Sequence, residues 1–131
     1  MISGDMKIKV GKAALHLIPE VVLIYVAMAF DYGQNFYKRW NWRLGNNNLS
    51  DYYGAARRHM AKWYEGRGEG PGRDTDPDSK CHHIDAAIAS LMILRDLIIG
   101  DREGTVPNVK DDRPFIMVAD LAHDQLQEKE D

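Results

Sequence analysis

The stretch from Val21 to Phe30 is an unbroken run of apolar side chains, and it constrains the fold more than any other part of the sequence. Pro19 and Glu20 suit the first turn of a helix and Gly33 suits its end, so we predict a helix over residues 19–32. A helix that is apolar on every side is expected to be buried all round. A chain of 131 residues has too little other surface to cover it, which predicts a homo-oligomer, either a dimer or a dimer of dimers.

The same run limits where the protein can work. It is shorter than the roughly 20 residues that a membrane-spanning helix needs, so no membrane partner is expected. It lies too far from a basic start, and lacks the small-residue cleavage site, to be a good signal peptide. The net charge of -3 implies no general attraction to nucleic acid. The single cysteine, Cys81, excludes an internal disulfide framework and fits a reducing compartment, so we expect a cytoplasmic protein.

Three further helices are predicted from apolar periodicity and from residues that typically cap helix ends. Ser50 suits an N-cap, Gly100 suits the end of a helix with a wide apolar stripe, and Asp112 suits the cap of a last helix. The chain length suits one domain over residues 1–131. We therefore predict an all-α, four-helix bundle completed by oligomerisation, with core helices over residues 19–32, 50–65, 79–99 and 114–127.

The first candidate for chemistry is the segment CHHID at residues 81–85. His82 and Asp85 are three residues apart and share one face of the third predicted helix. A carboxylate beside an imidazole can hold a divalent metal or orient a water molecule. The alternative is a capping region, in which Asp85 favours the helix dipole and the histidines are solvated.

The second predicted helix carries His59 among apolar neighbours, together with a basic pair. An inward His59 is either a hydrogen-bonded core residue or a ligand. Arg58 and Lys62 are four residues apart and can jointly face a polyanion, since the planar fork of arginine matches phosphate oxygens. The alternative for this pair is an ordinary solvated face.

The segment FYKRWNWR, residues 36–43, is aromatic and basic. Aromatic side chains beside Arg and Asn can stack on a nucleobase and hydrogen-bond its edge. Equally, Trp40 and Trp42 can plug the end of the bundle. Lys12, in VGKAAL, is a candidate phosphate contact, although one lysine after one glycine does not make a P-loop.

Four segments occur in an order that resembles a known family. They are GKAALHLIP, FDYGQNFYKRWNWRLG, AARRHMAKWYEGRGE and DPDSKCHHIDAAIAS, and they cover about residues 10–95. In this order and spacing they resemble the phage and bacterial dATP/dGTP diphosphohydrolase domains, which share the all-α MazG-like fold of nucleotide pyrophosphohydrolases.

The sequence departs from the family pattern at the metal ligands. The usual MazG-like pattern holds magnesium with E-E-x-x-E on one helix and E-x-x-D on the next, and the first of these motifs is missing here. Set against that pattern, His59 falls where the last glutamate would be, and His82-x-x-Asp85 falls where E-x-x-D would be. The resemblance therefore supports the reaction class more than any particular ligand.

The resemblance implies cleavage of a purine nucleoside triphosphate, dGTP before dATP, between the α and β phosphates, in phage-type nucleotide-pool metabolism in the host cytoplasm. It implies a divalent metal, Mg²⁺ or Mn²⁺ and then Co²⁺, because histidine ligands shift the preference away from Mg²⁺. The residues that it implicates fall into four groups: Asp85 and His59 for catalysis; Asp85, His82, His83, His59, Asp78 and Asp31 for metal; Arg58, Lys62 and Lys12 for phosphate; and Tyr37, Asn41 and Trp42 for the base.

Two other functions remain open at this point. The scarcity of carboxylates also suits a non-catalytic nucleotide-binding bundle, in which the helical fold persists without metal chemistry. The aromatic segment also suits a small helical protein that binds another protein.

Overall fold

The fold is known from a computed structural model that describes residues 12–66 and 71–115. Its helices are η2 (Leu15–Leu17), α1 (Glu20–Gln34), η3 (Asn41–Leu44), α2 (Leu49–Glu65), η4 (Pro71–Asp74) and α3 (His83–Glu103), the η elements being short 3-10 helices. Over these two ranges there is no strand, only isolated bridges from Asn48 to Lys110 and from Thr75 to His82. The predicted all-α class is confirmed.

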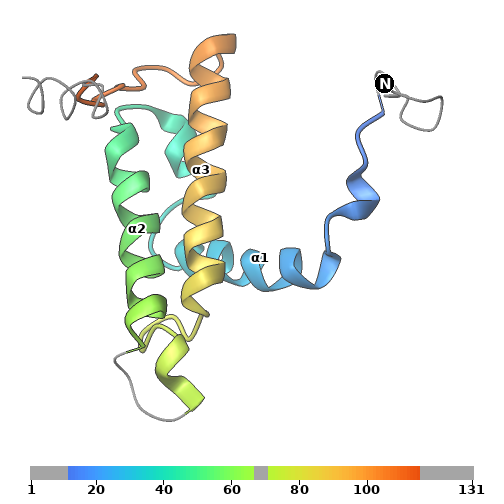
Figure 1. Cartoon of the computed structure of the whole chain (residues 1–131). Coiled ribbons are helices and arrows are strands. Elements are labelled where there is room, and N and C mark those ends of the chain that lie inside the picture. The colour runs from blue at the N-terminus through green and yellow to red at the C-terminus, as the bar shows by residue number, and fades with distance from the viewer. Residues whose placement is uncertain (1–11, 67–70, 116–131) are drawn as a thin grey trace, which may run out of the picture.

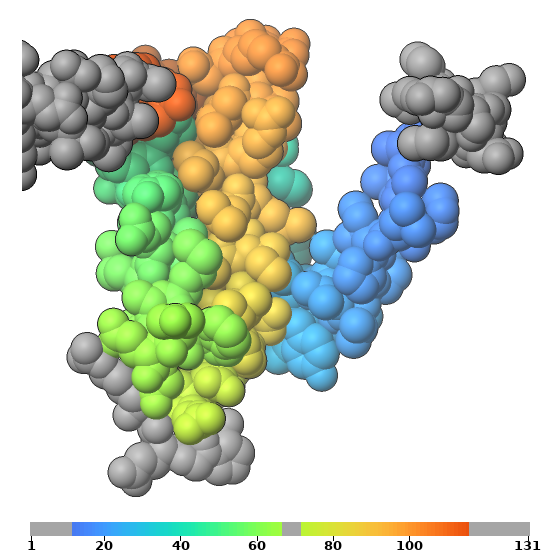
Figure 2. Space-filling view, in the orientation of Figure 1, coloured from blue at the N-terminus to red at the C-terminus, as the bar shows by residue number. Residues whose placement is uncertain are grey.

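Helices α2 and α3 form an antiparallel pair that is the main body of the structure (Figure 1). Helix α1 crosses this pair and packs on α3. The segment before α1 leads away from α2 and α3, so that α1 and residues 12–19 project to one side of the molecule (Figure 2).

The buried core lies where α2 begins and α3 ends. Leu49, Leu97 and Val106 form its centre. The chain can fold back onto α3 here because Gly100 has no side chain: a Cβ at this position would lie 2.4 Å from Cγ2 of Val106. The predicted end of the helix at Gly100 is therefore wrong. The helix continues to Glu103 and ends at Gly104, which has a left-handed φ of 72°.

The predicted end of the second helix at Glu65 is confirmed, and the remaining helix boundaries up to α3 differ from the structure by one to four residues. Helix α2 begins at Leu49 rather than Ser50, so Ser50 lies within its first turn. Asp112 accepts hydrogen bonds from the Ser50 amide and hydroxyl, which makes it a cap for α2 rather than for a later helix. Helix α3 begins at His83 rather than 79, because a hydrogen-bonded turn occupies the residues before it.

The fourth predicted helix, over residues 114–127, falls mostly outside the described residues. Its first two residues, Pro114 and Phe115, are described and are not helical.

Helix α1 is less buried in this single chain than its composition predicts. Val26 is its one buried residue, and Val21 and Ile24 are 59% and 63% exposed. The expected burial of α1 on every side is therefore not achieved by contacts among the described residues. None of the helices in the described residues is long and apolar enough to cross a membrane.

Candidate functional site

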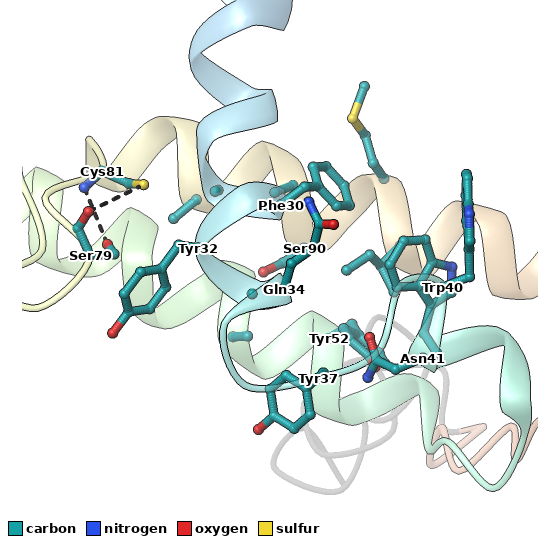
Figure 3. Close-up of a pocket in the computed structure, with 18 of the residues that line it drawn as sticks. Phe30, Tyr32, Gln34, Tyr37, Trp40, Asn41, Tyr52, Ser79, Cys81 and Ser90 are labelled. Carbon is teal, nitrogen blue, oxygen red and sulfur yellow. Dashed lines mark hydrogen bonds between the residues drawn. The ribbon is translucent and has the colours of Figure 1, made fainter.

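A cavity of about 1190 Å³ lies between α1, α2, α3 and the segment that joins α1 to α2. Figure 3 shows Ser79 and Cys81 at one end of it and Trp40 at the other. The end of α1 contributes Phe30, Tyr32 and Gln34 to the space between. The two ends differ in chemistry, since one carries imidazole and carboxylate groups and the other carries aromatic rings.

The first end is a cluster of His59, Asp76 and His83, which come from α2, the loop before α3 and the first residue of α3. One potential ligand atom from each residue lies within 4.8 Å of the others. Nδ1 of His59 is 3.0 Å from Nδ1 of His83, so without a metal one ring donates a hydrogen bond to the other. His83 is buried, while His59 and Asp76 are half-buried and line the cavity.

Asp76 is held in place by the turn that it begins. The amides of Asp78 and Ser79 donate to its Oδ1 at 2.9 and 3.1 Å. Because both amides donate to Oδ1, the turn makes no use of Oδ2 of Asp76. The Asp76 amide also donates to the carbonyl of Cys81 at 2.8 Å, which ties the turn to the start of α3.

The two imidazoles are kept uncharged. Burial and the facing His83 ring lower the pKa of His59, and the charge of Lys62 acts in the same direction. Burial and Lys62 likewise lower the pKa of His83. Since the ordinary pKa of histidine is about 6.5, both rings are neutral at pH 7, which is the form that binds metal.

Asp76 stays ionised. Partial burial acts to raise its pKa, but the hydrogen bonds from the Ser79 and Asp78 amides outweigh burial and hold the pKa below its ordinary value. Two neutral imidazoles and one carboxylate are a donor set suited to a divalent transition metal. The residues present therefore fit the metal that the sequence predicts.

The other end of the cavity is aromatic. The ring centres of Trp40 and Trp42 are 5.4 Å apart, and those of Trp42 and Phe30 are 5.8 Å apart. Trp40 and Trp42 are two of the side chains that line the cavity. A wall of this kind can stack on a nucleobase.

The structure brings several of the predicted site residues together at this cavity. His59 and Asp78 line it near the cluster, and His83 belongs to the cluster. The three residues predicted to bind the base, Tyr37, Asn41 and Trp42, all line the cavity.

Other predicted metal ligands lie apart from the cluster. His82 is the N-cap of α3, where its Nδ1 accepts from the Ile84 amide at 3.0 Å, which agrees with a capping region, although His83 beside it is buried rather than solvated. Asp85 lies in the first turn of α3, is half-buried and is not among the three clustered ligands. Asp31 is exposed near the end of α1 and accepts from Gln34.

The three predicted phosphate contacts differ in their positions. Lys62 is exposed and does not line the cavity, but its charge acts on the pKa of all three cluster residues. Arg58 affects His59, and its Nη1 lies back over Gly54. Lys12 lies on the exposed segment that leads away from α2 and α3 (Figure 1).

Three functional candidates were missed from the sequence. Asp76 could have been found from the pattern Asp-Pro-Asp-Ser, in which a first aspartate commonly accepts amides two and three residues ahead. Lys38 and Arg39 line the cavity, and these two cations follow Tyr37 directly in the sequence.

Comparison with known proteins identifies the family. The family described as dATP/dGTP diphosphohydrolase, N-terminal, matches residues 3–106, a range that contains both ends of the cavity. The chain belongs to this family. No curated protein and no solved structure matches the chain. The resemblance noted from four sequence segments is thus confirmed, and the name of the family implies a hydrolase with a nucleotide substrate.

Proposed function

We propose that this protein is a metal-dependent nucleoside triphosphate diphosphatase that cleaves a purine deoxynucleotide, dGTP before dATP, into a monophosphate and pyrophosphate. The observation that carries this proposal is that one cavity is lined both by the aromatic wall and by His59 and Asp76, two members of the cluster that also contains His83. The family supports the same chemistry. The substrates of such a reaction are cytoplasmic, and a role in phage nucleotide-pool metabolism, in the host cytoplasm, follows from the resemblance.

His59, His83 and Asp76 are the residues that would hold the metal. A bound divalent ion would neutralise phosphate charge and lower the pKa of a water molecule. Because two of the three donors are nitrogen, we expect Mn²⁺ to support turnover better than Mg²⁺, with Co²⁺ as a further active ion.

The side chains of the protein divide the remaining tasks. Tyr37, Asn41 and Trp42 would bind the base, and Lys62 would hold the β and γ phosphates near the cluster. Hydrolysis joins the oxygen of water to the α-phosphorus and breaks the bond to the bridging oxygen, so that pyrophosphate leaves. The lowered pKa of Asp76 makes this residue a good ligand but a weak proton acceptor. Asp85 does not line the cavity, so we propose that the proton of the water passes to solvent instead.

The decisive experiment measures the products of a nucleotide panel. Purified protein is incubated with dGTP, dATP, dCTP or GTP and with Mn²⁺, Mg²⁺ or Co²⁺, and phosphate is measured with and without added inorganic pyrophosphatase. Phosphate that appears only with pyrophosphatase shows that pyrophosphate is the product. Asp101→Asn is the matched control for aspartate variants at the site, because Asp101 is an exposed aspartate near the far end of α3. The absence of turnover with every nucleotide and metal would reject the proposal.

A non-catalytic nucleotide-binding protein is the second candidate, and the presence of only one carboxylate in the cluster favours it. A thermal shift experiment separates the two functions. Stabilisation by dGTP only when Mn²⁺ is also present supports the enzyme. Stabilisation by dGTP alone supports the binding protein, and no response supports a protein-interaction role.

We also propose that the protein forms a homodimer or a dimer of dimers through α1. Val21, Ile24 and Met28 are large apolar residues of this helix, and each is exposed in the single chain. Light scattering at micromolar concentration should give a mass of two or four chains. The double variant Val21→Asp, Ile24→Asp should give a smaller mass, and a wild-type monomer would contradict the proposal.

A further inference from the structure

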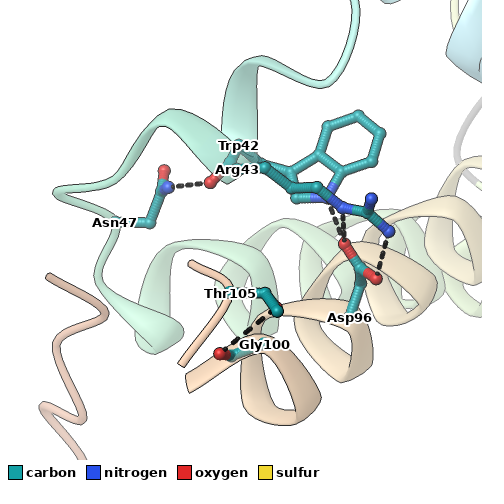
Figure 4. Close-up of polar contacts among 6 residues, drawn as sticks. All are labelled: Trp42, Arg43, Asn47, Asp96, Gly100 and Thr105. Atoms are coloured by element: carbon teal, nitrogen blue, oxygen red, sulfur yellow. Dashed lines mark hydrogen bonds and ion pairs between the residues drawn. The ribbon is translucent and has the colours of Figure 1, made fainter. Parts of the chain in front are cut away.

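One carboxylate, that of Asp96, ties the aromatic end of the cavity to α3 (Figure 4). The Trp42 indole Nε1–H donates to Asp96 Oδ2 at 2.7 Å. Arg43 donates to both oxygens, from Nε to Oδ2 at 2.7 Å and from Nη2 to Oδ1 at 2.8 Å. Asp96 therefore accepts three hydrogen bonds from η3, whose residues Trp42 and Arg43 precede it in the sequence by 54 and 53 positions.

The effect of Asp96 extends beyond the residues that it touches. The Arg43 guanidinium carbon lies 4.4 Å from the centre of the Trp40 ring, and Trp40 in turn contacts Trp42. The carboxylate thus fixes Trp42 directly and Trp40 through Arg43. Both rings line the cavity, so their orientation determines the surface that a planar ligand meets.

The backbone of this segment also depends on its surroundings. Trp40 has a φ of 59°, in the left-handed region that a bulky side chain seldom adopts. Such a conformation persists where other contacts hold it. The bonds from Arg43 and Trp42 to Asp96 provide contacts of that kind directly after Trp40 in the chain.

The position of Asp96 suits a residue that affects nucleotide binding and not hydrolysis. It lies on α3 at position 96, whereas His83 begins the same helix. At 1.5 Å per residue, thirteen residues correspond to about 20 Å along the helix axis. Its side chain is 30% exposed and lines the cavity, but its oxygens are engaged by the indole and the guanidinium.

We propose that Asp96 is a positioning residue that sets the Trp40 and Trp42 wall for stacking on the nucleobase, and so controls nucleotide affinity without taking part in hydrolysis. This inference rests on the proposed function. It assigns the affinity for the base to an ion pair between η3 and α3, and it separates that affinity from the metal cluster at the other end of the cavity.

The test compares kinetic constants among matched variants. Asp96→Asn keeps the shape of the side chain but removes its charge, and should raise KM for dGTP about 10-fold while kcat stays within about twofold. Asp96→Glu restores the charge and should recover part of the loss. Asp111→Asn is the control, because Asp111 forms the same kind of ion pair, with Arg113, but does not line the cavity. It should leave both constants unchanged.

A second measurement needs no nucleotide. Acrylamide should quench tryptophan fluorescence more strongly in Asp96→Asn than in wild type or Asp111→Asn, because the wall is no longer held. If Asp96→Asn fails to fold by circular dichroism, Arg43→Lys tests the same contact from the other side, since an ammonium cannot make the two-point bond. A KM and quenching equal to those of the control, or a fall in kcat with KM unchanged, would overturn the inference.

Failure of the proposed function would look different. Wild-type protein would then neither bind dGMP nor turn over dGTP with any metal, before any substitution is made. That result would reject the nucleobase as the ligand of the wall. A wild type that is active, with Asp96→Asn indistinguishable from Asp111→Asn, would reject the role of Asp96 alone.

Discussion

The two ends of the cavity are built in contrasting ways. At the first, His59, Asp76 and His83 come from separate elements, and backbone hydrogen bonds to Asp76 fix the loop that joins them. At the second, Trp40 and Trp42 belong to one short segment, and the polar contacts of that segment with α3 converge on Asp96.

This contrast suggests that the two ends can be altered independently. The first end is held by main-chain bonds, which a substitution of one side chain leaves largely in place. The second end depends on a side-chain carboxylate, which one substitution removes. Changes at the first end should therefore affect the rate of hydrolysis, and changes at the second should affect affinity.

The largest effect is expected at the metal end. Asp76→Asn replaces a charged ligand with a neutral one but keeps an oxygen that can accept the amides of Asp78 and Ser79. We expect kcat for dGTP with Mn²⁺ to fall by a factor of about 100 or more, which corresponds to roughly 3 kcal/mol of barrier. Calorimetry with Mn²⁺ alone should show weakened binding, and the thermal stability of the apoprotein should change little.

The matched comparison for this prediction is Asp85→Asn, which removes the aspartate that the sequence favoured. The clustered geometry predicts a smaller loss for Asp85 than for Asp76. If the Asp76→Asn variant keeps full activity and the Asp85→Asn variant is inactive, the metal ligand is Asp85, as the sequence suggested, and not Asp76.

The second effect is expected at the aromatic wall. Trp42→Ala removes a ring that contacts both Trp40 and Phe30 in tilted arrangements. Stacking on an aromatic side chain contributes about 1–3 kcal/mol per base, so Kd should rise about 10-fold or more for dGTP and dGMP alike. Trp42→Phe keeps a ring and should lose less. Because Trp42 also packs against the core, circular dichroism must confirm folding. A loss confined to the triphosphate would contradict a base-binding role.

The third effect concerns the phosphates. It should differ between dGTP and dGMP, whereas the effect of Trp42→Ala should be the same for both. The charge of Lys62 acts on the pKa of all three cluster residues. Lys62→Ala should raise KM for dGTP roughly 10-fold and largely spare the binding of dGMP, because a triphosphate presents charges that a monophosphate lacks. Arg58→Ala tests the neighbouring cation in the same assay. Lys12→Ala should stay within about twofold of wild type, and an equal effect of all three substitutions would indicate a general charge effect instead of a site.

Helices were predictable from the sequence because the apolar periodicity and the cap residues are local. Their exact ends were not, because distant contacts decide them. Gly100 resembles a terminator in sequence, yet it lies inside α3 and makes room for Val106. Ser50 resembles a cap, yet Asp112 of the segment after α3 caps that helix end from 62 positions away.

The site was predictable in part, and for a similar reason. The sequence marked His59 and His83 as candidates but could not pair them, since only the packing of α2 on α3 brings their rings together. Asp76 was missed because its suitability as a metal ligand depends on a turn that places its carboxylate near two histidines from other elements. Asp96 directly follows Arg95 in the apolar middle of α3, and nothing near it in the sequence marks it as the partner of Trp42 and Arg43.

The smallest effect concerns stability and shows whether the aromatic end is held by charge. The hydrogen bond from Arg43 lowers the pKa of Asp96 below its ordinary value of 3.8. The folded state therefore favours the ionised carboxylate, and this contribution to stability is complete above the unfolded pKa and is lost as pH falls through the folded one. Urea unfolding of apoprotein should show wild type to be slightly more stable than Asp96→Asn from pH 7 to about pH 5.

That difference should shrink as pH falls below about 4, where Asp96 takes up a proton in the unfolded chain while the folded carboxylate stays ionised, and should be lost as pH falls through the lower folded pKa. Asp111→Asn is again the control. Asp111 and Arg113 are two residues apart and can pair in the unfolded chain as well, so their ion pair should contribute less to stability at any pH. A difference between wild type and Asp96→Asn that persists undiminished at pH 3 would mean that side-chain shape, rather than charge, holds the aromatic wall against α3.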